Sequence, residues 1–137
     1  MQTTSGIATI NPATGETVRH YAAHDATETD RRIGQAQSAF EALRGTTFAQ
    51  RAAWMRATAA ILESEAEAQA RILTLEMGKP LAQARAEVLR CAKSMRFYAE
   101  HAETFLEDEV LEDPSAVGAS RAYARYEPLG VVLAVMP

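Results

Sequence analysis

Residues 131–136 read Val-Val-Leu-Ala-Val-Met, and this short stretch decides the fold class. Every position is apolar and several are β-branched, which is typical of a strand buried on both faces of a parallel sheet. The run is far too short to cross a bilayer, so no membrane span is expected. A strand of this kind needs neighbours on both edges and covering layers on both sides. The stretch therefore predicts an α/β fold.

Upstream, the pattern predicts a β-hairpin and then helices. Residues 7–10 and 16–21 flank an Asn11–Gly15 turn, in which Pro and Gly suit the backbone. The helices are expected from an N-cap at Thr27 to Gly45, from an N-cap at Thr47 to a polar break at 63–67, from that break to Gly78, and from Pro80 to about Phe105. Four helices and a hairpin could cover one face of a sheet at most. A bare apolar strand is an aggregation hazard, so we expect a piece of a longer protein or of an oligomer.

Two of these helices carry apolar stripes at helical spacing. The stripe of the second helix is widened by Trp54 and Ile61, and comprises Phe48, Ala52, Met55, Ala59, Leu62 and Ala66. The stripe of the longest helix is rich in Ala, which predicts a close approach to its neighbour, and comprises Leu81, Ala84, Val88, Ala92, Met95, Ala99, Ala102 and Leu106.

Beyond the last helix, the residue pattern predicts a change of structure. The carboxylate-rich run 107–113 predicts a solvated loop rather than a cation site, because acidic groups oppose the dipole at a helix C-terminus. Residues 121–126 alternate as in a two-faced strand, and residues 128–130 predict a kink. The expected divisions are a helical part over 1–118, a strand segment over 119–129 and the start of a sheet over 130–137.

Composition limits the function classes. The chain has 137 residues and a formal net charge of −4, and without a basic run a nucleic-acid partner is not expected. With Cys91 as the only cysteine, no internal disulfide can form, and a reducing compartment fits. The first residues resemble no secretory or transit signal. A cytoplasmic protein is therefore expected.

The residues that could carry chemistry do not form a catalytic set. The sequence has no Gly-rich phosphate loop, and His20, His24 and His101 lack the spacing of metal ligands. Cys91 stands next to Arg90 and near Lys93, cations that could lower its pKa. It lies inside an expected helix, however, so a structural cysteine is favoured over a nucleophile.

Three segments together resemble the aldehyde dehydrogenase superfamily in order and spacing. Residues 11–16 (Asn-Pro-Ala-Thr-Gly-Glu) resemble its opening hairpin, residues 74–80 (Thr-Leu-Glu-Met-Gly-Lys-Pro) a helix-to-helix junction, and residues 126–132 (Tyr-Glu-Pro-Leu-Gly-Val-Val) the lead-in to the first strand of its nucleotide domain. Residues 76–88, 91–93 and 98–103 are most similar to bacterial NAD(P)-dependent succinate-semialdehyde dehydrogenases. Another aldehyde dehydrogenase subfamily, or a non-catalytic helical interaction module, remains the alternative.

The resemblance implies the N-terminal helical portion of that fold: a hairpin, about four helices, an oligomerisation strand and the first strand of a Rossmann-like sheet. In this family a cysteine attacks the aldehyde, hydride passes to NAD or NADP, and a glutamate activates the water that hydrolyses the thioester. The sequence contains no match to these residues or to the cofactor loop. A truncated chain without catalytic residues, inactive by itself, is therefore expected.

The resemblance also implies minor roles. Val135, Met136 and Pro137 match a strand end where the cofactor lies. Arg90 matches a position bordering the substrate tunnel, where it could attract an acidic semialdehyde. An exposed surface cation is favoured over this role. Thr9 and Glu76 match a monovalent-cation site of some relatives. Residues 121–126 resemble the strand that joins an intersubunit sheet, which implies a homodimer or homotetramer.

Overall fold

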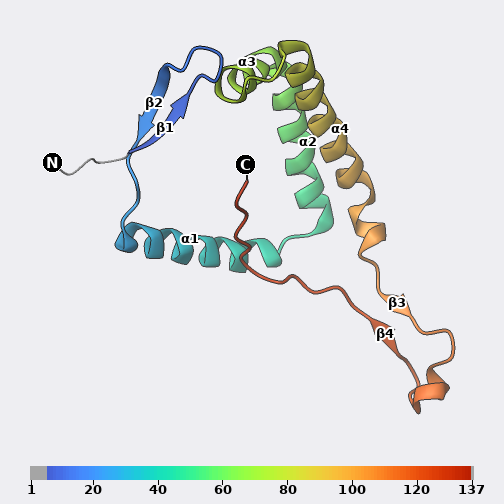
Figure 1. Ribbon diagram of the computed structural model, residues 1–137. Helices are drawn as coiled ribbons and strands as arrows, with labels where there is room; N and C mark the ends of the chain where they lie inside the picture. Colours follow the sequence, from blue (N-terminus) through green and yellow to red (C-terminus); the bar gives the residue numbers. More distant parts are fainter. Residues whose placement is uncertain (1–5, 137) are drawn as a thin grey trace.

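The computed structural model describes residues 6–136 and consists of four α-helices, two small antiparallel hairpins and a C-terminal segment without regular structure (Figure 1). The elements, in chain order, are β1 (Ile7–Ile10), β2 (Thr17–Tyr21), α1 (Ala26–Arg44), α2 (Phe48–Ser64), α3 (Ala66–Met77), α4 (Leu81–Phe105), β3 (Glu109–Val110), the 3-10 turn η1 (Pro114–Val117) and β4 (Tyr123–Ala124). The predicted hairpin and the four predicted helices are confirmed.

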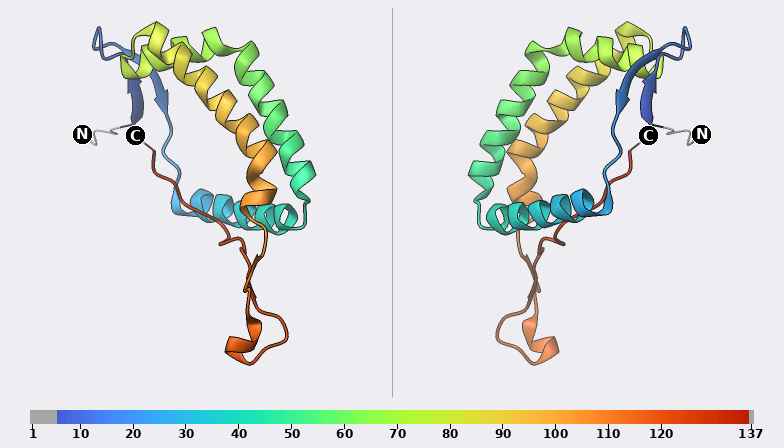
Figure 2. Two further views of the ribbon diagram at one scale, coloured as in Figure 1. Left: turned by 90° about the vertical axis from the view of Figure 1, so that its right-hand side faces the viewer. Right: turned by 90° about the vertical axis from the view of Figure 1, so that its left-hand side faces the viewer.

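Helices α2, α3 and α4 form the packed part of the molecule. α2 and α4 run side by side, and α3 lies across one end of the pair (Figures 1 and 2). The buried side chains are all small, as the Ala-rich stripe of the longest helix predicted for α4: Ala59, Ala66, Ala70, Ala84, Val88 and Ala92. Because the fully buried side chains are small, the helix backbones can approach closely. The larger Met55, Leu62 and Met95 are only partly buried.

This packing corrects one expectation about α2. Trp54 and Ile61 do not widen its buried stripe, because they are 53% and 54% exposed. Helix α4 packs against α2 through alanines and covers only the centre of the apolar stripe of α2. Large apolar residues at its margins therefore stay at the surface.

Local capping chemistry sets most helix boundaries. Thr47 caps α2 and, with Gln50, forms a reciprocal capping box. Gly78 ends α3 in the left-handed region, at φ 71°. The predicted cap at Thr27 is wrong, because the carboxylate of Asp25 accepts a hydrogen bond from the Glu28 amide at 2.8 Å and starts α1 two residues earlier.

Helix α1 stands apart from the packed helices, and no residue of it is buried (Figure 1). Its large apolar side chains are only partly covered: Ile33 is 58% exposed and Leu43 47%. The N-terminal hairpin lies at the opposite side, next to α3 (Figure 1). In that hairpin Ile7 pairs with Tyr21 and Thr9 with Arg19.

A second hairpin follows α4 and projects from the molecule (Figures 1 and 2). Its two strands pair in antiparallel fashion, with Glu109 opposite Ala124 and Val110 opposite Tyr123. The strand predicted over residues 121–126 is therefore shorter than expected. The acidic run 107–113, predicted as a loop, contributes β3, because its backbone finds a partner in β4.

The stretch 131–136 is not a strand in this structure. Its side chains are exposed, with Leu133 and Val135 both 87% accessible. A strand needs a partner for its backbone groups, and no other segment of residues 6–136 pairs with it. The prediction of a strand that starts a sheet is thus not met here. The divisions at 118/119 and 129/130 stay predictions.

Candidate functional site

The N-terminal hairpin contacts the junction of α3 and α4. A Cβ atom added to Gly78 would lie 3.0 Å from Cγ of Pro12, so the hairpin turn fits closely against this junction. A shallow pocket at the same place is lined by Asn11, Ala13, Arg71, Thr74, Leu75 and Leu81. The structure therefore places β1, which carries Thr9, and α3, which carries Glu76, on neighbouring parts of the molecule.

A monovalent cation site at Thr9 and Glu76 stays a prediction. The Glu76 side chain is exposed near the end of α3, and Thr9 is half-buried in β1. Within residues 6–136, no three His, Cys, Asp or Glu side chains gather as metal ligands would. The structure thus offers no carboxylate cluster that would hold a cation at this place without further ligands.

The middle of α4 carries a row of polar groups around Arg90. Arg90 and Cys91 are both exposed, and Arg90 forms no ion pair with residues 6–136. One turn earlier on α4, Glu87 forms an ion pair with Lys79, which precedes the helix, and the hydrogen bond from Lys79 is the main reason that the pKa of Glu87 is lowered. Arg90 is thus exposed near the Glu87 carboxylate, and its positive charge also lowers the pKa of Glu87.

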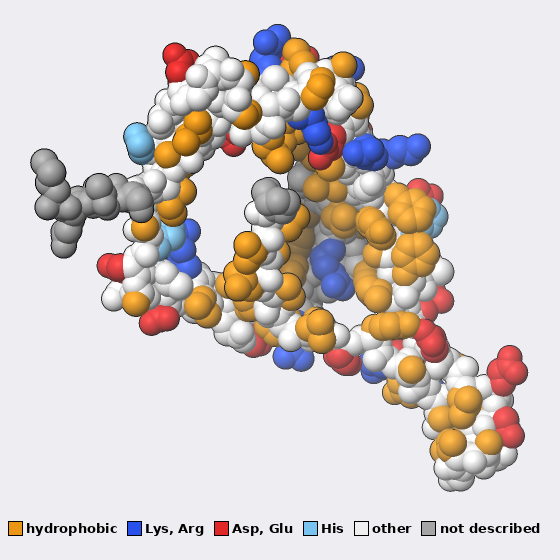
Figure 3. All heavy atoms as spheres, in the orientation of Figure 1, with side chains coloured by type: hydrophobic (Ala, Val, Ile, Leu, Met, Phe, Trp, Pro, Cys, Tyr) orange, Lys and Arg blue, Asp and Glu red, His pale blue; other side chains and the backbone are white. Residues whose placement is uncertain are grey.

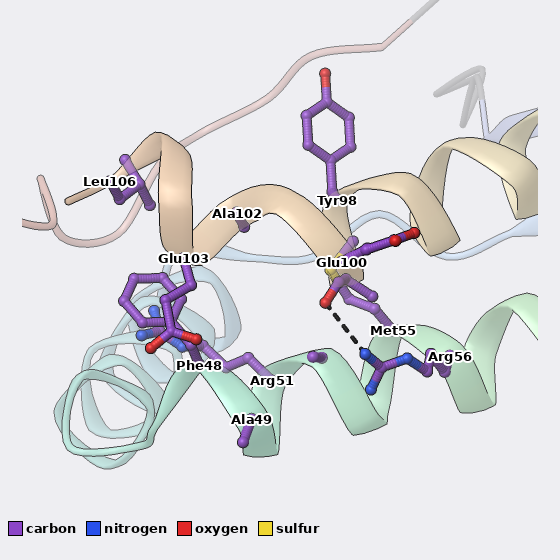
Figure 4. Close-up of a pocket in the computed structure, with 12 residues that line it drawn as sticks. Phe48, Ala49, Arg51, Met55, Arg56, Tyr98, Glu100, Ala102, Glu103 and Leu106 are labelled. Atoms are coloured by element: carbon purple, nitrogen blue, oxygen red, sulfur yellow. Dashed lines mark hydrogen bonds between the residues drawn. The ribbon is translucent and has the colours of Figure 1, made fainter.

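A groove between the first turns of α2 and the last turns of α4 is a further candidate that the sequence reasoning missed (Figure 4). The Arg51 guanidinium lies over the Phe48 ring at 4.4 Å. Its Nε is buried and finds no hydrogen-bond partner among the described residues. Arg56 Nη2 donates to the carbonyl of Ala99 at 3.4 Å. The sequence signal was an Arg on the apolar side of a helix.

The polar side chains that line the groove are arginines, glutamates and one tyrosine. The carboxylates at its wall are Glu100 and Glu103, and neither pairs with Arg51 or Arg56 in the structure. Among the lining residues there is no cysteine, serine or histidine. The groove can therefore bind or pack against another group.

The base of the second hairpin is held by side-chain contacts. Arg125 donates two hydrogen bonds to Asp108, Nε to Oδ1 at 2.9 Å and Nη2 to Oδ2 at 2.6 Å, and these contacts hold the pKa of Asp108 below its usual range. The hydroxyl of Tyr126 donates to Glu109, which raises the tyrosine pKa. Arg121 and Arg125 lie over the Tyr123 ring at 4.8 and 5.0 Å.

The residues expected to contact a cofactor lie beyond this hairpin. Val135 and Met136 are 87% and 79% exposed, and Pro137 lies outside the described residues. Figure 3 shows apolar side chains along the C-terminal segment, in the middle of the view. The structure does not bring Val135 and Met136 together with Arg90 in one pocket.

No residue of the described chain forms a catalytic set with its neighbours. Cys91 is exposed on α4, without a histidine or carboxylate hydrogen-bonded to it. The helices described here include none that is long and apolar enough to span a bilayer.

The comparison with known proteins decides the family. The model of the "Aldehyde dehydrogenase family" matches residues 1–137. The chain belongs to the aldehyde dehydrogenase family. The resemblance to this family was carried by three segments: the hairpin turn, the Gly78 junction and the lead-in 126–132. In the structure the first two lie against each other.

Named relatives place this aldehyde dehydrogenase chain near one subfamily. It is 58% identical over 131 residues to "Succinate-semialdehyde dehydrogenase [NADP(+)] 1" of Mycobacterium tuberculosis and 56% identical to "Succinate-semialdehyde dehydrogenase [NADP(+)]" of Mycobacterium leprae, in each case over 96% of its length. The predicted subfamily resemblance is confirmed. The chain spans 28% of the length of these curated relatives.

A solved structure confirms the fold of the family's N-terminal portion. The succinic semialdehyde dehydrogenase from Streptococcus pyogenes, in complex with NADP+, superposes with a TM-score of 0.76 at 27% identity. The match covers 85% of this chain and 25% of that one. The hairpin and four helices of this aldehyde dehydrogenase chain therefore adopt the arrangement expected from the resemblance.

Proposed function

We propose that this chain forms the N-terminal part of an NADP-dependent succinate-semialdehyde dehydrogenase. The supporting observation is the 58% identity to a mycobacterial enzyme of that name over nearly the whole chain. The complete enzyme would oxidise succinate semialdehyde, or a related short aldehyde, to the carboxylic acid. Another aldehyde dehydrogenase activity is the alternative, because relatives of this family act on different aldehydes.

The described residues fit a contact with the cofactor but not its full binding. Val135 and Met136 are apolar and exposed, so they can pack against a flat ring of NADP. The chain has no Gly-rich loop to hold the phosphates. NADP would supply the hydride acceptor, while Val135, Met136 and Pro137 would form one wall of its site.

The covalent chemistry would rest on residues outside this chain. The family's cysteine nucleophile and glutamate base have no counterpart here, and Cys91 on α4 is not placed like a nucleophile. A polypeptide of residues 1–137 alone would be inactive as a dehydrogenase. The described residues would instead supply the helical support for the cofactor domain.

Arg90 is the residue that would favour an acidic substrate. It is exposed on α4 without an ion pair among residues 6–136, so its guanidinium can attract a carboxylate. In the complete enzyme, Arg90→Met should raise KM for succinate semialdehyde several-fold and leave KM for uncharged short aldehydes unchanged. Arg85→Met, on the same helix and also exposed, is the matched control. Equal losses for all aldehydes would contradict this role.

The assembly and its location are further parts of the proposal. The hairpin β3–β4 would join a sheet between subunits, giving a homodimer or homotetramer in the cytoplasm. Thr9 and Glu76 would contribute to a monovalent-cation site. The support for these roles is the family resemblance of the segments that carry them.

The test compares substrates and cofactors on the protein encoded by the complete gene. We expect a higher kcat/KM for succinate semialdehyde than for acetaldehyde or butyraldehyde, and faster reduction of NADP+ than of NAD+. An enzyme that prefers an uncharged aldehyde would replace the subfamily proposal by the alternative. A protein that reduces neither cofactor with any aldehyde would overturn the proposal.

A further inference from the structure

The end of α4 and the lead-in to the C-terminal segment are tied together at a single place. Asp108 lies just after α4, and Arg125 follows β4, yet their side chains meet through two parallel hydrogen bonds of 2.9 and 2.6 Å. The residues that follow Asp108 and Arg125 form a second contact, in which the Tyr126 hydroxyl donates a hydrogen bond to the Glu109 carboxylate. The two chain segments are therefore joined side chain to side chain where they leave the packed helices.

The backbone contacts of this hairpin are few. β3 and β4 have two residues each, and beyond them the Leu111 amide donates across the hairpin to the carbonyl of Ala122 at 2.9 Å; the other backbone bonds lie within the connecting turn. A two-stranded ribbon of this length has little stability of its own. The Asp108–Arg125 ion pair is thus a large part of what fixes the hairpin base.

Surface ion pairs contribute little to stability, and Arg125 is 53% exposed. A bidentate pair between a planar guanidinium and a carboxylate, however, fixes direction as well as distance. Asp108 is the more buried partner, with 25% of its side chain accessible. The pair therefore suits a role in orientation better than a role in stability.

The orientation of Tyr126 passes to the C-terminal segment through a short and stiff lead-in. Residues 127–130 separate Tyr126 from Val131, and four residues span at most about 14 Å. Pro128 has a fixed φ and also restricts Glu127 before it. Gly130 then turns the chain, at φ 110°. A shift at Arg125 would therefore move Val131 and the residues after it.

We propose that the Asp108–Arg125 pair is a positioning device that sets where residues 131–136, and with them Val135 and Met136, meet the NADP molecule. The inference rests on the proposed function, because it takes Val135 and Met136 to contact NADP. Asp108 and Arg125 themselves do not contact the cofactor. Both act through the lead-in 126–130. Loss of the pair weakens cofactor binding while the chemistry at saturating cofactor continues.

The test uses the complete enzyme and the variants Asp108→Asn, Arg125→Gln and the charge-swapped double variant Asp108→Arg with Arg125→Asp. We expect each single variant to raise the NADP+ Kd and KM about fivefold, with kcat within about twofold of the parent, and the swap to recover most of the affinity. In the cofactor-free protein, amide exchange of residues 126–136 should be faster in the single variants and restored in the swap.

A matched control is available on α1. Glu28 accepts two hydrogen bonds from Arg31, both at 2.7 Å, in the same bidentate geometry but far along the chain from the lead-in. Glu28→Gln should leave NADP+ affinity and the exchange of residues 126–136 unchanged. If Glu28→Gln had the effect of Asp108→Asn, a general loss of surface charge would explain both, and the positioning role would be overturned.

The remaining outcomes separate the two proposals. A parent enzyme that binds NADP+ and oxidises succinate semialdehyde, with Asp108→Asn indistinguishable from it, overturns the positioning role alone. A single variant that lowers kcat and leaves the NADP+ KM unchanged does the same. A parent protein that binds no NADP+ overturns the proposed function, and the inference with it.

Discussion

Gly78 combines a left-handed backbone with a close neighbour. It ends α3 at φ 71°, and a Cβ there would meet Pro12 Cγ at 3.0 Å. Gly78→Ala should therefore lower the free energy of unfolding by about 1–2 kcal/mol, since left-handed backbone is strained for any residue with a Cβ. Urea unfolding, followed by the circular dichroism of the helices, would measure the change.

Gly34 gives the opposite expectation and serves as the control. It lies inside α1, where an added Cβ would meet nothing within 4 Å. Gly34→Ala should raise stability by about 0.5–1 kcal/mol, because alanine favours the helix. Two changes of the same sign would contradict this account of the Gly78 junction.

The ionisation of Glu28 should make the stability of the first turn of α1 depend on pH. Hydrogen bonds from Arg31, and then from Arg32, lower its pKa from 4.5 to about 2. Because the folded pKa is below the unfolded one, the stabilising contribution is complete above pH 4.5 and is lost as the pH falls towards 2. A carboxyl NMR titration should give a midpoint near 2, and the midpoint should rise towards 4.5 in the double variant Arg31→Gln, Arg32→Gln. An unchanged midpoint in that variant would exclude the arginines as the cause.

At the level of elements, the pairing of α2 and α4 depends on small side chains. Ala92 is fully buried in this interface, so Ala92→Leu would force the helices apart. We expect a loss of about 1–3 kcal/mol in the free energy of unfolding. Ala86→Leu, at an exposed position of the same helix, should change it by less than about 0.5 kcal/mol. Equal effects at the two positions would mean that the helices do not pack through alanine.

The same helices show which parts of the fold can be predicted from sequence. Thr47 and Gly78 were predicted correctly because a cap or a left-handed turn is decided by adjacent residues. The N-cap of α1 was predicted at Thr27 and lies at Asp25. Either side chain can cap a helix, and only the backbone conformation shows which of them does. Trp54 was wrongly assigned to the interface, since the width of a buried stripe depends on the partner helix.

For the candidate site, the sequence could predict individual residues but not the contacts between them. The role of Arg90 stays a prediction, because its exposure fits a surface cation as well as a substrate contact. Whether it faces a substrate depends on segments that pack against α4. The pairing of Asp108 with Arg125 was not predicted, because the two residues are brought together by a hairpin whose strands are too short to show a pattern. Long-range contacts of this kind need the fold.

At the scale of the whole molecule, the feature with the largest consequence is the apolar segment 131–136. Its backbone has no strand partner within residues 6–136, and Val132 and Leu133 are 71% and 87% exposed. Exposed apolar β-prone segments pair with one another. A polypeptide of residues 1–137 should therefore self-associate, with an average mass in sedimentation equilibrium that rises with concentration.

Charges placed on this segment should reverse the association. Consecutive residues of a strand point to opposite faces, so the double variant Val132→Lys, Leu133→Lys would disfavour both faces at once and should shift the polypeptide towards the monomer. Trp54→Lys is the matched control, because Trp54 is also exposed, at 53%, but lies on a helix and offers no backbone for pairing. It should leave the association unchanged. A monomeric parent polypeptide, or equal effects of the two variants, would show that residues 131–136 do not act as an open strand.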